Sequence, residues 1–247
     1  MEQKFTSYTK EDHQIWNILF NRQISNLEGR VCNRYLECLL EMKEAIGGNL
    51  IPRFTELNDT LLVKTGWSIQ IVPGLIPVEE FFEFLAKKSF CSSRWLRGKH
   101  QLDYIEEPDM FHDIFGHVPL LMDDDYAAFA RKIGELGLKH IGNPEIIKQL
   151  QRIYWFTIEF GILREDENIR IYGAGIISSP KESEYVFDKR VNRKPFNLKE
   201  IIHHEFRTDV LQDCYYYIDS FEQLYQSINE FENLIPEKLK RKRLSNC

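Results

Sequence analysis

Apolar residues along most of the chain recur at the spacing of a helical turn, which predicts a mostly helical protein. The first such run follows Thr9 and continues to about Leu27, with apolar side chains at Ile15 and Leu19. Thr9 followed by Asp12 is typical of a capped helix start. The same spacing and its start and stop residues predict helical segments over residues 30–46, 55–64, 123–139, 144–163, 180–188, 197–204 and 220–234, and one that opens at Pro77.

A few short strands are predicted between these helices. Residues 67–72 and 169–172 carry strand-like runs, and residues 206–211 and 214–218 are expected to form a strand pair. The segment 89–96 fits neither a helix nor a strand clearly. The expected fold class is therefore α+β, mostly α with a few short strands.

The length of 247 residues suits one large domain with a sizeable core. No repeat, low-complexity stretch or long linker divides the chain. We therefore expect residues 1–247 to form a single domain, with its core over about 8–234 and a short basic tail over 236–247. The basic cluster in this tail is read as a solvated terminus.

The composition narrows the class of partner. A net charge of −6 argues against nucleic acid as a main partner. The five cysteines are scattered, odd in number and without a CxxC pair, which favours free thiols in a reducing compartment. No signal core and no apolar run of membrane-span length is found, so we expect a soluble cytoplasmic protein. The 17 Phe, 11 Tyr and 4 Trp indicate an aromatic-rich core or pocket, of which the core is the simpler interpretation.

The stretch EPDMFHDIFGHVPLL, at residues 107–121, holds two histidines five residues apart. On a continuous α-helix, His112 and His117 would lie about 140° apart and could not face one ion. Gly116 and Pro119 are typical of a helix end. We therefore expect His112 on a short helix and His117 on the loop that leaves it, so that the chain folds back and both imidazoles meet. The alternative is two unrelated polar residues near a helix end.

Glu159 interrupts a stretch that is apolar almost all round, residues 153–163. A carboxylate buried there is costly unless it is paired or bound to a metal. One interpretation is an ion pair with Arg94, Arg97 or Arg152. The other is a third metal ligand beside the two histidines, with Trp155 one turn earlier on the same face.

Two histidines and one carboxylate suit two kinds of metal site. One is the facial triad of non-haem Fe(II) oxygenases, which leaves coordination positions open. The other is the site of a zinc-dependent hydrolase. Zinc hydrolases usually show HExxH on one helix, and this chain lacks that motif, which favours iron.

Four segments, in this order, resemble the pterin-dependent aromatic amino acid hydroxylases. They are VPGLIPVEEF at 72–81, EPDMFHDIFGHVPLL at 107–121, IYWFTIEFG at 153–161 and YGAGIISS at 172–179. With the helical patterns around them, the resemblance covers most of residues 8–234. Members of this family hydroxylate the ring of phenylalanine, tyrosine or tryptophan with O2, Fe(II) and a tetrahydropterin, in a mostly helical catalytic domain. The resemblance implies the same fold, activity and cofactors here.

The resemblance also implies roles for residues of the metal and substrate sites. The implied iron ligands are His112, His117 and Glu159. Arg97 would hold the substrate carboxylate, to which a guanidinium fork is well matched. Ser178 would assist in the amino acid site, and Trp155 would pack on the substrate ring.

A second group would hold the pterin, which is tetrahydrobiopterin or a related compound. Gly74 and Leu75 would line its site, and Phe81 would stack on it. Tyr154 and Glu107 would lie between the pterin and the iron. Taken singly, each residue has a simpler interpretation as a core aromatic or a surface charge, and only the joint match favours the functional one.

Some positions depart from the animal enzymes and resemble the short bacterial members. Ile105 and Glu106 stand where animal members usually have Thr-Pro, and Asp113 follows the first histidine where they usually have glutamate. Trp155 resembles the phenylalanine and tyrosine enzymes of the family, and the segment FRTDVLQ at 206–212 resembles the bacterial phenylalanine branch more than the tyrosine branch. We therefore expect a monooxygenase of phenylalanine catabolism that converts L-phenylalanine to L-tyrosine.

Three alternatives remain at this point. The chain could be a tyrosine or tryptophan hydroxylase of the same family, a zinc-dependent hydrolase with the same His/His/Glu site, or a non-catalytic helical binding protein. We expect a small-molecule substrate, no nucleic acid or membrane partner, and a monomer or small homo-oligomer.

Overall fold

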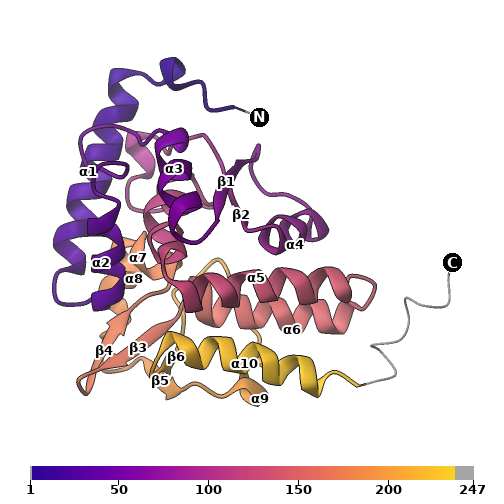
Figure 1. Ribbon diagram of the computed structural model, residues 1–247. Helices are drawn as coiled ribbons and strands as arrows, with labels where there is room; N and C mark the ends of the chain where they lie inside the picture. Colours follow the sequence, from indigo (N-terminus) through magenta and orange to yellow (C-terminus); the bar gives the residue numbers. More distant parts are fainter. Residues whose placement is uncertain (1, 237–247) are drawn as a thin grey trace, which may run out of the picture.

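The computed structural model describes residues 2–236, which are mostly helical with a few short strands, as the apolar spacing predicts (Figure 1). Residues 237–247, most of the predicted basic tail, lie outside the described part. The α-helices are α1 (Lys10–Leu27), α2 (Asn33–Glu41), α3 (Phe54–Lys64), α4 (Val78–Ala86), α5 (Asp124–Lys139), α6 (Pro144–Tyr154), α7 (Ala174–Ile177), α8 (Pro180–Tyr185), α9 (Leu198–Ile201) and α10 (Phe221–Leu234). None of the helices described is long and apolar enough to cross a membrane.

The strands form two small sheets. In the first, β1 (Ser68–Ile71) pairs in parallel with β2 (Ser89–Ser92). The segment 89–96, which the sequence assigned to neither a helix nor a strand, therefore begins as a strand. The second has the order β4-β3-β6-β5, with bounds Asn168–Ile171, Ile162–Glu165, Cys214–Ile218 and Asn192–Pro195. Only β3 and β4 are antiparallel, and β6 runs parallel to both of its neighbours.

Helix starts lie where the capping residues predict them. The hydroxyl of Thr9 accepts from the backbone N–H of Asp12, and the Asp12 carboxylate accepts from the Thr9 N–H at 2.7 Å. This reciprocal pair satisfies two amides that the first turn of α1 leaves open. The caps of α6 and α10 are not reciprocal: the Asn143 side-chain oxygen accepts from the Ile146 N–H, and the Ser220 hydroxyl accepts from the Gln223 N–H.

Three of the predicted segments are wrong in extent or type. The second helix begins at Asn33 rather than Arg30, because Gly29 has a positive φ of 66° and Val31 bridges to Ile171 at the sheet. The helix predicted over 144–163 ends at Tyr154. Residues 206–211 form a loop instead of a strand, and β6 finds its partners in β3 and β5.

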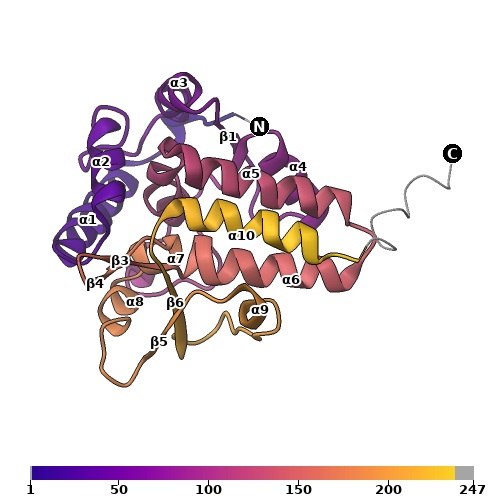
Figure 2. The same cartoon turned by 60° about the horizontal axis from the view of Figure 1, so that its bottom comes forward.

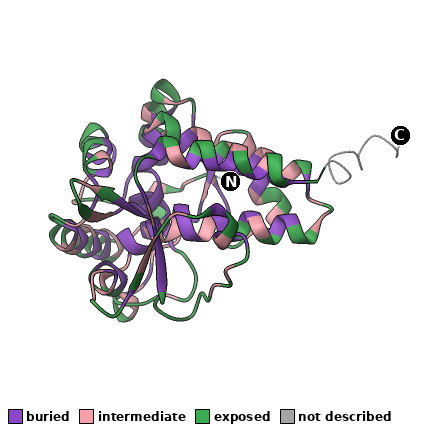
Figure 3. Cartoon of the chain, turned by 90° about the horizontal axis from the view of Figure 1, so that it is seen from below, coloured by how far each residue is buried: buried purple, intermediate pink, exposed green. Residues whose placement is uncertain are grey.

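Three long helices form one side of the molecule. In Figure 2, α5, α10 and α6 lie side by side, with α10 between the other two in this view. Buried and exposed residues alternate along these helices (Figure 3). Lys132 and Lys139 of α5 both pair with Glu232 of α10 at the solvent edge. The metal-binding candidates lie on the segments between these helices and the N-terminal ones.

Helix α4 packs unusually close to α5 at two glycines. A Cβ added at Gly134 would lie 2.4 Å from the backbone nitrogen of Ala86, and one at Gly137 would lie 2.2 Å from the ring of Phe82. Real Cβ atoms do not approach so closely, so the helices could not keep this separation with any other residue at these positions. Phe82 and Leu85 are fully buried at this contact.

We therefore expect Gly134→Ala to destabilise the protein although alanine favours helix formation. Overpacking of this kind costs about 1–3 kcal/mol, which exceeds the gain of up to ~1 kcal/mol from helix propensity. Chemical denaturation with far-UV circular dichroism measures the change. Gly142→Ala is the control, since a Cβ there meets nothing within 4 Å. Equal unfolding midpoints for the two variants would contradict the close approach.

Candidate metal centre

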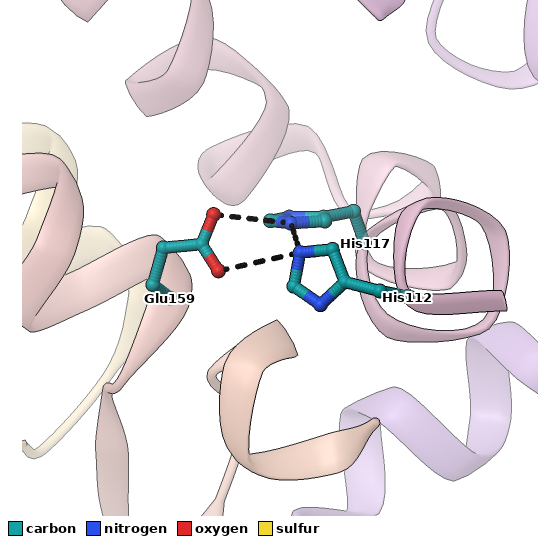
Figure 4. A group of neighbouring side chains, drawn as sticks. All are labelled: His112, His117 and Glu159. Carbon is teal, nitrogen blue, oxygen red and sulfur yellow. Dashed lines mark hydrogen bonds and ion pairs between the residues drawn. The ribbon is translucent and has the colours of Figure 1, made fainter. Parts of the chain in front are cut away.

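Both histidines of the 107–121 stretch lie on one π-helix, His112–His117. The prediction that His117 lies on a loop is wrong. A π turn closes i→i+5 hydrogen bonds, so it is wider than an α turn. It brings a residue back to the same side of the helix as the residue five positions earlier. Figure 4 shows the two rings leaving the same coil of ribbon toward one point.

The local sequence explains why the helix widens at this point. Pro119 has no N–H, so the carbonyl of Phe115 lacks the donor that an α-helix would supply four residues on. Gly116 lets the turn approach α7, because a Cβ there would lie only 3.0 Å from both the carbonyl oxygen and the Cβ of Ala174. The residues read as a helix end are those that allow a wide turn.

Glu159 ends a second π-helix, Trp155–Glu159, which continues directly from α6. The N–H of Phe160 donates to the carbonyl of Trp155, an i→i+5 bond of 2.9 Å. After it the chain turns sharply at Gly161, where a Cβ would lie 2.1 Å from the ring of Tyr172. Apolar burial continues through the π turn into β3, so periodicity alone reads the whole stretch as one helix.

The two π-helices bring the three predicted ligands together, as the dashed lines of Figure 4 show. The Nε2 atoms of His112 and His117 are 3.1 Å apart. The Glu159 oxygens lie 3.5 Å from the His112 Nε2 and 3.2 Å from the His117 Nε2. Bonds of about 2.1 Å to one metal ion, at near right angles, separate ligand atoms by about 3 Å. The donor set and its spacing therefore fit a single metal ion.

The charge state of the group suits a divalent cation. Burial lowers the pKa of His112 to about 4, so its imidazole is neutral at neutral pH. Burial raises the pKa of Glu159, but His117 and His112 outweigh it and hold that pKa below its ordinary value. A carboxylate and neutral imidazoles are the forms that bind a metal. The predicted alternative, an ion pair of Glu159 with an arginine, is wrong. Arg97 pairs with Asp109 and Arg152 pairs with Glu205, whereas Glu159 contacts the two histidines.

Ser178 contacts a candidate ligand directly. Its hydroxyl donates to the carbonyl of Ala174 at 2.8 Å, so its oxygen accepts from the Nδ1–H of His112, also at 2.8 Å. This bond selects the tautomer in which the His112 Nε2 lone pair points at the other ligands. The sequence placed Ser178 in the amino acid site and did not foresee this contact.

Arg97 is held by a partner that the sequence did not assign. Its Nε and Nη2 atoms both donate to Asp109 at 2.8 Å, and both side chains are buried. Asp109 also accepts from the backbone N–H of His112 at 3.1 Å. Asp109 therefore links the Arg97 guanidinium to the turn that carries the histidine ligands. The predicted role in substrate binding stays a prediction, and the bonds to Asp109 leave Arg97 fewer free N–H groups than a solvated arginine has.

Aromatic rings in contact with one another connect Phe81, a predicted pterin residue, to the metal group through Tyr154. The Phe81 ring meets the Tyr154 ring edge-on at 5.3 Å, and Tyr154 lies 6.5 Å from the ring of His117. Gly74 and Leu75 lie on the loop before α4, where Leu75 is 74% exposed. Glu107 is exposed and makes no hydrogen bond or ion pair with any of residues 2–236. The structure therefore shows no such bond between Glu107 and the other predicted pterin residues.

The Trp155 side chain is held in place by three contacts. Its indole stacks on Phe206 at 4.4 Å, packs on Phe160 at 4.6 Å, and donates its N–H to the Gln212 side chain at 2.9 Å. The spacing argument that placed it on the face of Glu159 assumed an α-helix, whereas the π turn aligns Trp155 with Phe160. Gln212 was missed, since no local pattern links residues 57 positions apart.

The mostly helical fold and the His/His/Glu group define a class, that of proteins with a two-histidine, one-carboxylate metal site. Residues 3–242 match the family described as biopterin-dependent aromatic amino acid hydroxylase. The chain belongs to this family.

Individual relatives are similar over most of their length. The chain is 45% identical over 228 residues to the phenylalanine-4-hydroxylase of Ralstonia nicotianae, covering 92% of this chain and 72% of that protein. A structure of the Chromobacterium violaceum phenylalanine hydroxylase with bound oxidised Fe(III) has a TM-score of 0.90 at 41% identity, covering 97% of this chain and 85% of that one. Another structure of that enzyme, with iron(III) and 7,8-dihydrobiopterin, has a TM-score of 0.88 at 41% identity and covers 96% and 87%.

We expect His112→Ala to lose stoichiometric Fe(II) binding while the protein stays folded, because the remaining two ligands cannot complete the group. Metal analysis after anaerobic reconstitution measures the iron, and circular dichroism checks the fold. His203→Ala is the control, since His203 is exposed and outside the group. A folded His112→Ala protein with one tightly bound iron per chain would remove His112 from the ligand set.

Proposed function

We propose that the protein is a phenylalanine 4-monooxygenase, which converts L-phenylalanine to L-tyrosine with O2, non-haem Fe(II) and a tetrahydrobiopterin-type pterin. The observation that carries this proposal is the group of His112, His117 and Glu159, of which His117 is buried and the other two are partly buried, in a chain of the aromatic amino acid hydroxylase family. Phenylalanine is chosen because the similar curated proteins bear that name.

His112, His117 and Glu159 would hold the iron through two neutral nitrogens and one carboxylate. Three protein ligands leave further coordination positions open, as in the facial triads of Fe(II) oxygenases. Iron bound there would activate O2. With two electrons from the pterin, one oxygen atom would enter the ring and the other would be reduced to water. Ser178 keeps His112 in the metal-binding tautomer through its 2.8 Å contact.

The substrate would lie between Arg97 and Trp155. The guanidinium of Arg97 is buried and oriented by Asp109, so it offers a pre-organised positive charge to the amino acid carboxylate. Trp155 is oriented by Phe206 and Gln212 and would present its indole to the aromatic ring. Fixing the carboxylate at one end and the ring at the other selects the ring position that reaches the metal.

The pterin would lie against Phe81 and Tyr154. Phe81 is half-buried on α4 and would stack on the pterin ring. Burial raises the pKa of Tyr154 well above its ordinary value, so its hydroxyl stays protonated between the pterin and the metal ligands. Gly74 and Leu75 would complete this site, and Glu107 would lie between the pterin and the iron, as the resemblance implies.

Two further properties stay predictions. The four cysteines among residues 2–236 are free thiols, which supports the prediction of a cytoplasmic location. The expected monomer or small homo-oligomer rests on the sequence alone.

One assay separates the proposed activity from its rivals. The iron-loaded protein is mixed with tetrahydrobiopterin and phenylalanine, and O2 uptake and tyrosine formation are followed together. Tyrosine formation that requires all three components supports the proposal. A protein that binds only zinc and consumes no O2 would favour the zinc-dependent hydrolase, and one that holds no stoichiometric metal would favour the non-catalytic binding protein. Preference for tyrosine or tryptophan would change the substrate assignment.

We expect Arg97→Lys to raise the KM for phenylalanine by about tenfold or more, equivalent to about 1.4 kcal/mol. Lysine keeps the charge for Asp109 but has no fork with which to hold a second carboxylate. Alanine is the poorer test, because it would leave the buried Asp109 without its partner. Arg94→Lys, at an exposed neighbouring position, is the control. Unchanged phenylalanine dependence in Arg97→Lys would exclude this role.

We expect Trp155→Phe to raise the ratio of kcat/KM for tryptophan over phenylalanine, because it frees volume while keeping an aromatic face. Shape changes in an apolar site are worth about 1–3 kcal/mol. Steady-state competition between the two amino acids, with saturating pterin, measures the ratio. Trp16→Phe is the control, since it removes another buried indole whose N–H is also bonded, to Gly47. An unchanged ratio with intact iron content would return Trp155 to the role of a packing residue.

A further inference from the structure

We propose that Tyr35 is a positioning residue of the metal centre, whose hydroxyl holds open the wide turn that carries both histidine ligands. Tyr35 lies on α2, some 80 residues from the turn in sequence. Its hydroxyl donates to the backbone carbonyl of Phe115 at 2.6 Å. This inference rests on the metal centre proposed above.

The carbonyl of Phe115 needs this donor because of Pro119. In an α-helix that carbonyl would accept from the N–H of residue 119, and proline has none. A buried carbonyl without a donor is costly, and backbone groups in protein interiors are nearly always paired. Tyr35 replaces the missing donor from outside the helix, and so removes the cost of leaving the α-helical pattern at this point.

The surroundings of Tyr35 make it a rigid donor. The residue is fully buried, and its ring meets the Phe115 ring edge-on at 6.1 Å. Burial raises the pKa of its hydroxyl well above the ordinary value, so the hydroxyl stays protonated. Helix α2 is itself tied to the sheet, since the Cys32 N–H donates to the carbonyl of Ile171 at 2.9 Å.

The hydrogen bond from Tyr35 can affect the metal ligands because it is made between them in the chain. Phe115 lies between His112 and His117, and the carbonyl that Tyr35 holds belongs to the segment whose width brings the two Nε2 atoms to 3.1 Å. Gly116 and Ala174 fix the opposite side of the same segment. A shift of the carbonyl would therefore change the separation of the two ring nitrogens.

Tyr35→Phe tests this, since it removes the hydroxyl and keeps the ring. Tyr172→Phe is the matched control, because the Tyr172 hydroxyl is equally buried but has no hydrogen-bond partner within residues 2–236. The Co²⁺ dissociation constant is measured by competition with a chelator, together with the Co²⁺ absorption spectrum and far-UV circular dichroism. We expect affinity to fall about tenfold or more in Tyr35→Phe, as for other groups that orient metal ligands, with a changed spectrum.

The control is expected to keep the affinity and spectrum of the unmodified protein. Equal affinities for Tyr35→Phe and the unmodified protein would overturn the proposal, as would an equal loss in Tyr172→Phe. If the unmodified protein itself binds no stoichiometric Co²⁺ or Fe(II), the metal centre of the proposed function fails instead.

A double variant decides the matter if Tyr35→Phe does not fold. Tyr35→Phe/Pro119→Ala returns an N–H to residue 119, which can satisfy the Phe115 carbonyl by closing an α turn. We expect this protein to fold but to bind Co²⁺ at least about tenfold more weakly than the unmodified protein, because the histidines would then diverge. Full recovery of affinity together with folding would show that Tyr35 acts only on stability, and would overturn the proposal.

Discussion

The convergence of two imidazole nitrogens and one carboxylate in a buried place is the constraint on which the rest of the site depends. The three groups lie 3.1–3.5 Å apart, and a charged carboxylate at such a depth is stable only beside compensating partners. An ordinary α-helix cannot supply this arrangement from residues five apart. The protein meets the requirement with two π turns, one for the histidine pair and one that ends at Glu159.

Each wide turn costs regular backbone bonding, and the surrounding structure compensates for it. Tyr35 supplies a donor to the Phe115 carbonyl, and Asp109 accepts from the amide of His112. The Thr157 hydroxyl donates to the carbonyl of Ile153 within the second turn. Because Tyr35 comes from α2, some 80 residues away, the geometry of the metal group also depends on how the domain packs. Substitutions far from the ligands can therefore change metal affinity without touching the ligands.

The residues proposed to bind substrate and pterin contact the metal group from two sides. Arg97 reaches the metal-bearing turn through Asp109, and Ser178 reaches it through His112. On the other side, Tyr154 joins Phe81 to His117. If these residues have the proposed roles, both organic reactants would be held by side chains that are one contact from a metal ligand. Such a shared frame suits a reaction in which two organic partners and O2 must meet at one metal ion.

Much of this protein follows from its sequence alone. The helical spacing and capping residues determined the positions of α1, α3, α5 and α10, and the order of the motifs determined the family and the three candidate ligands. Only the tertiary structure decided the widths of the turns. It also decided the hydrogen bond between Trp155 and Gln212 and the contacts of Tyr35 and Asp109. The reason is physical: periodicity and capping act between neighbours in the chain, whereas a π turn, a buried ion pair and a donor 80 residues away depend on partners that meet only on folding.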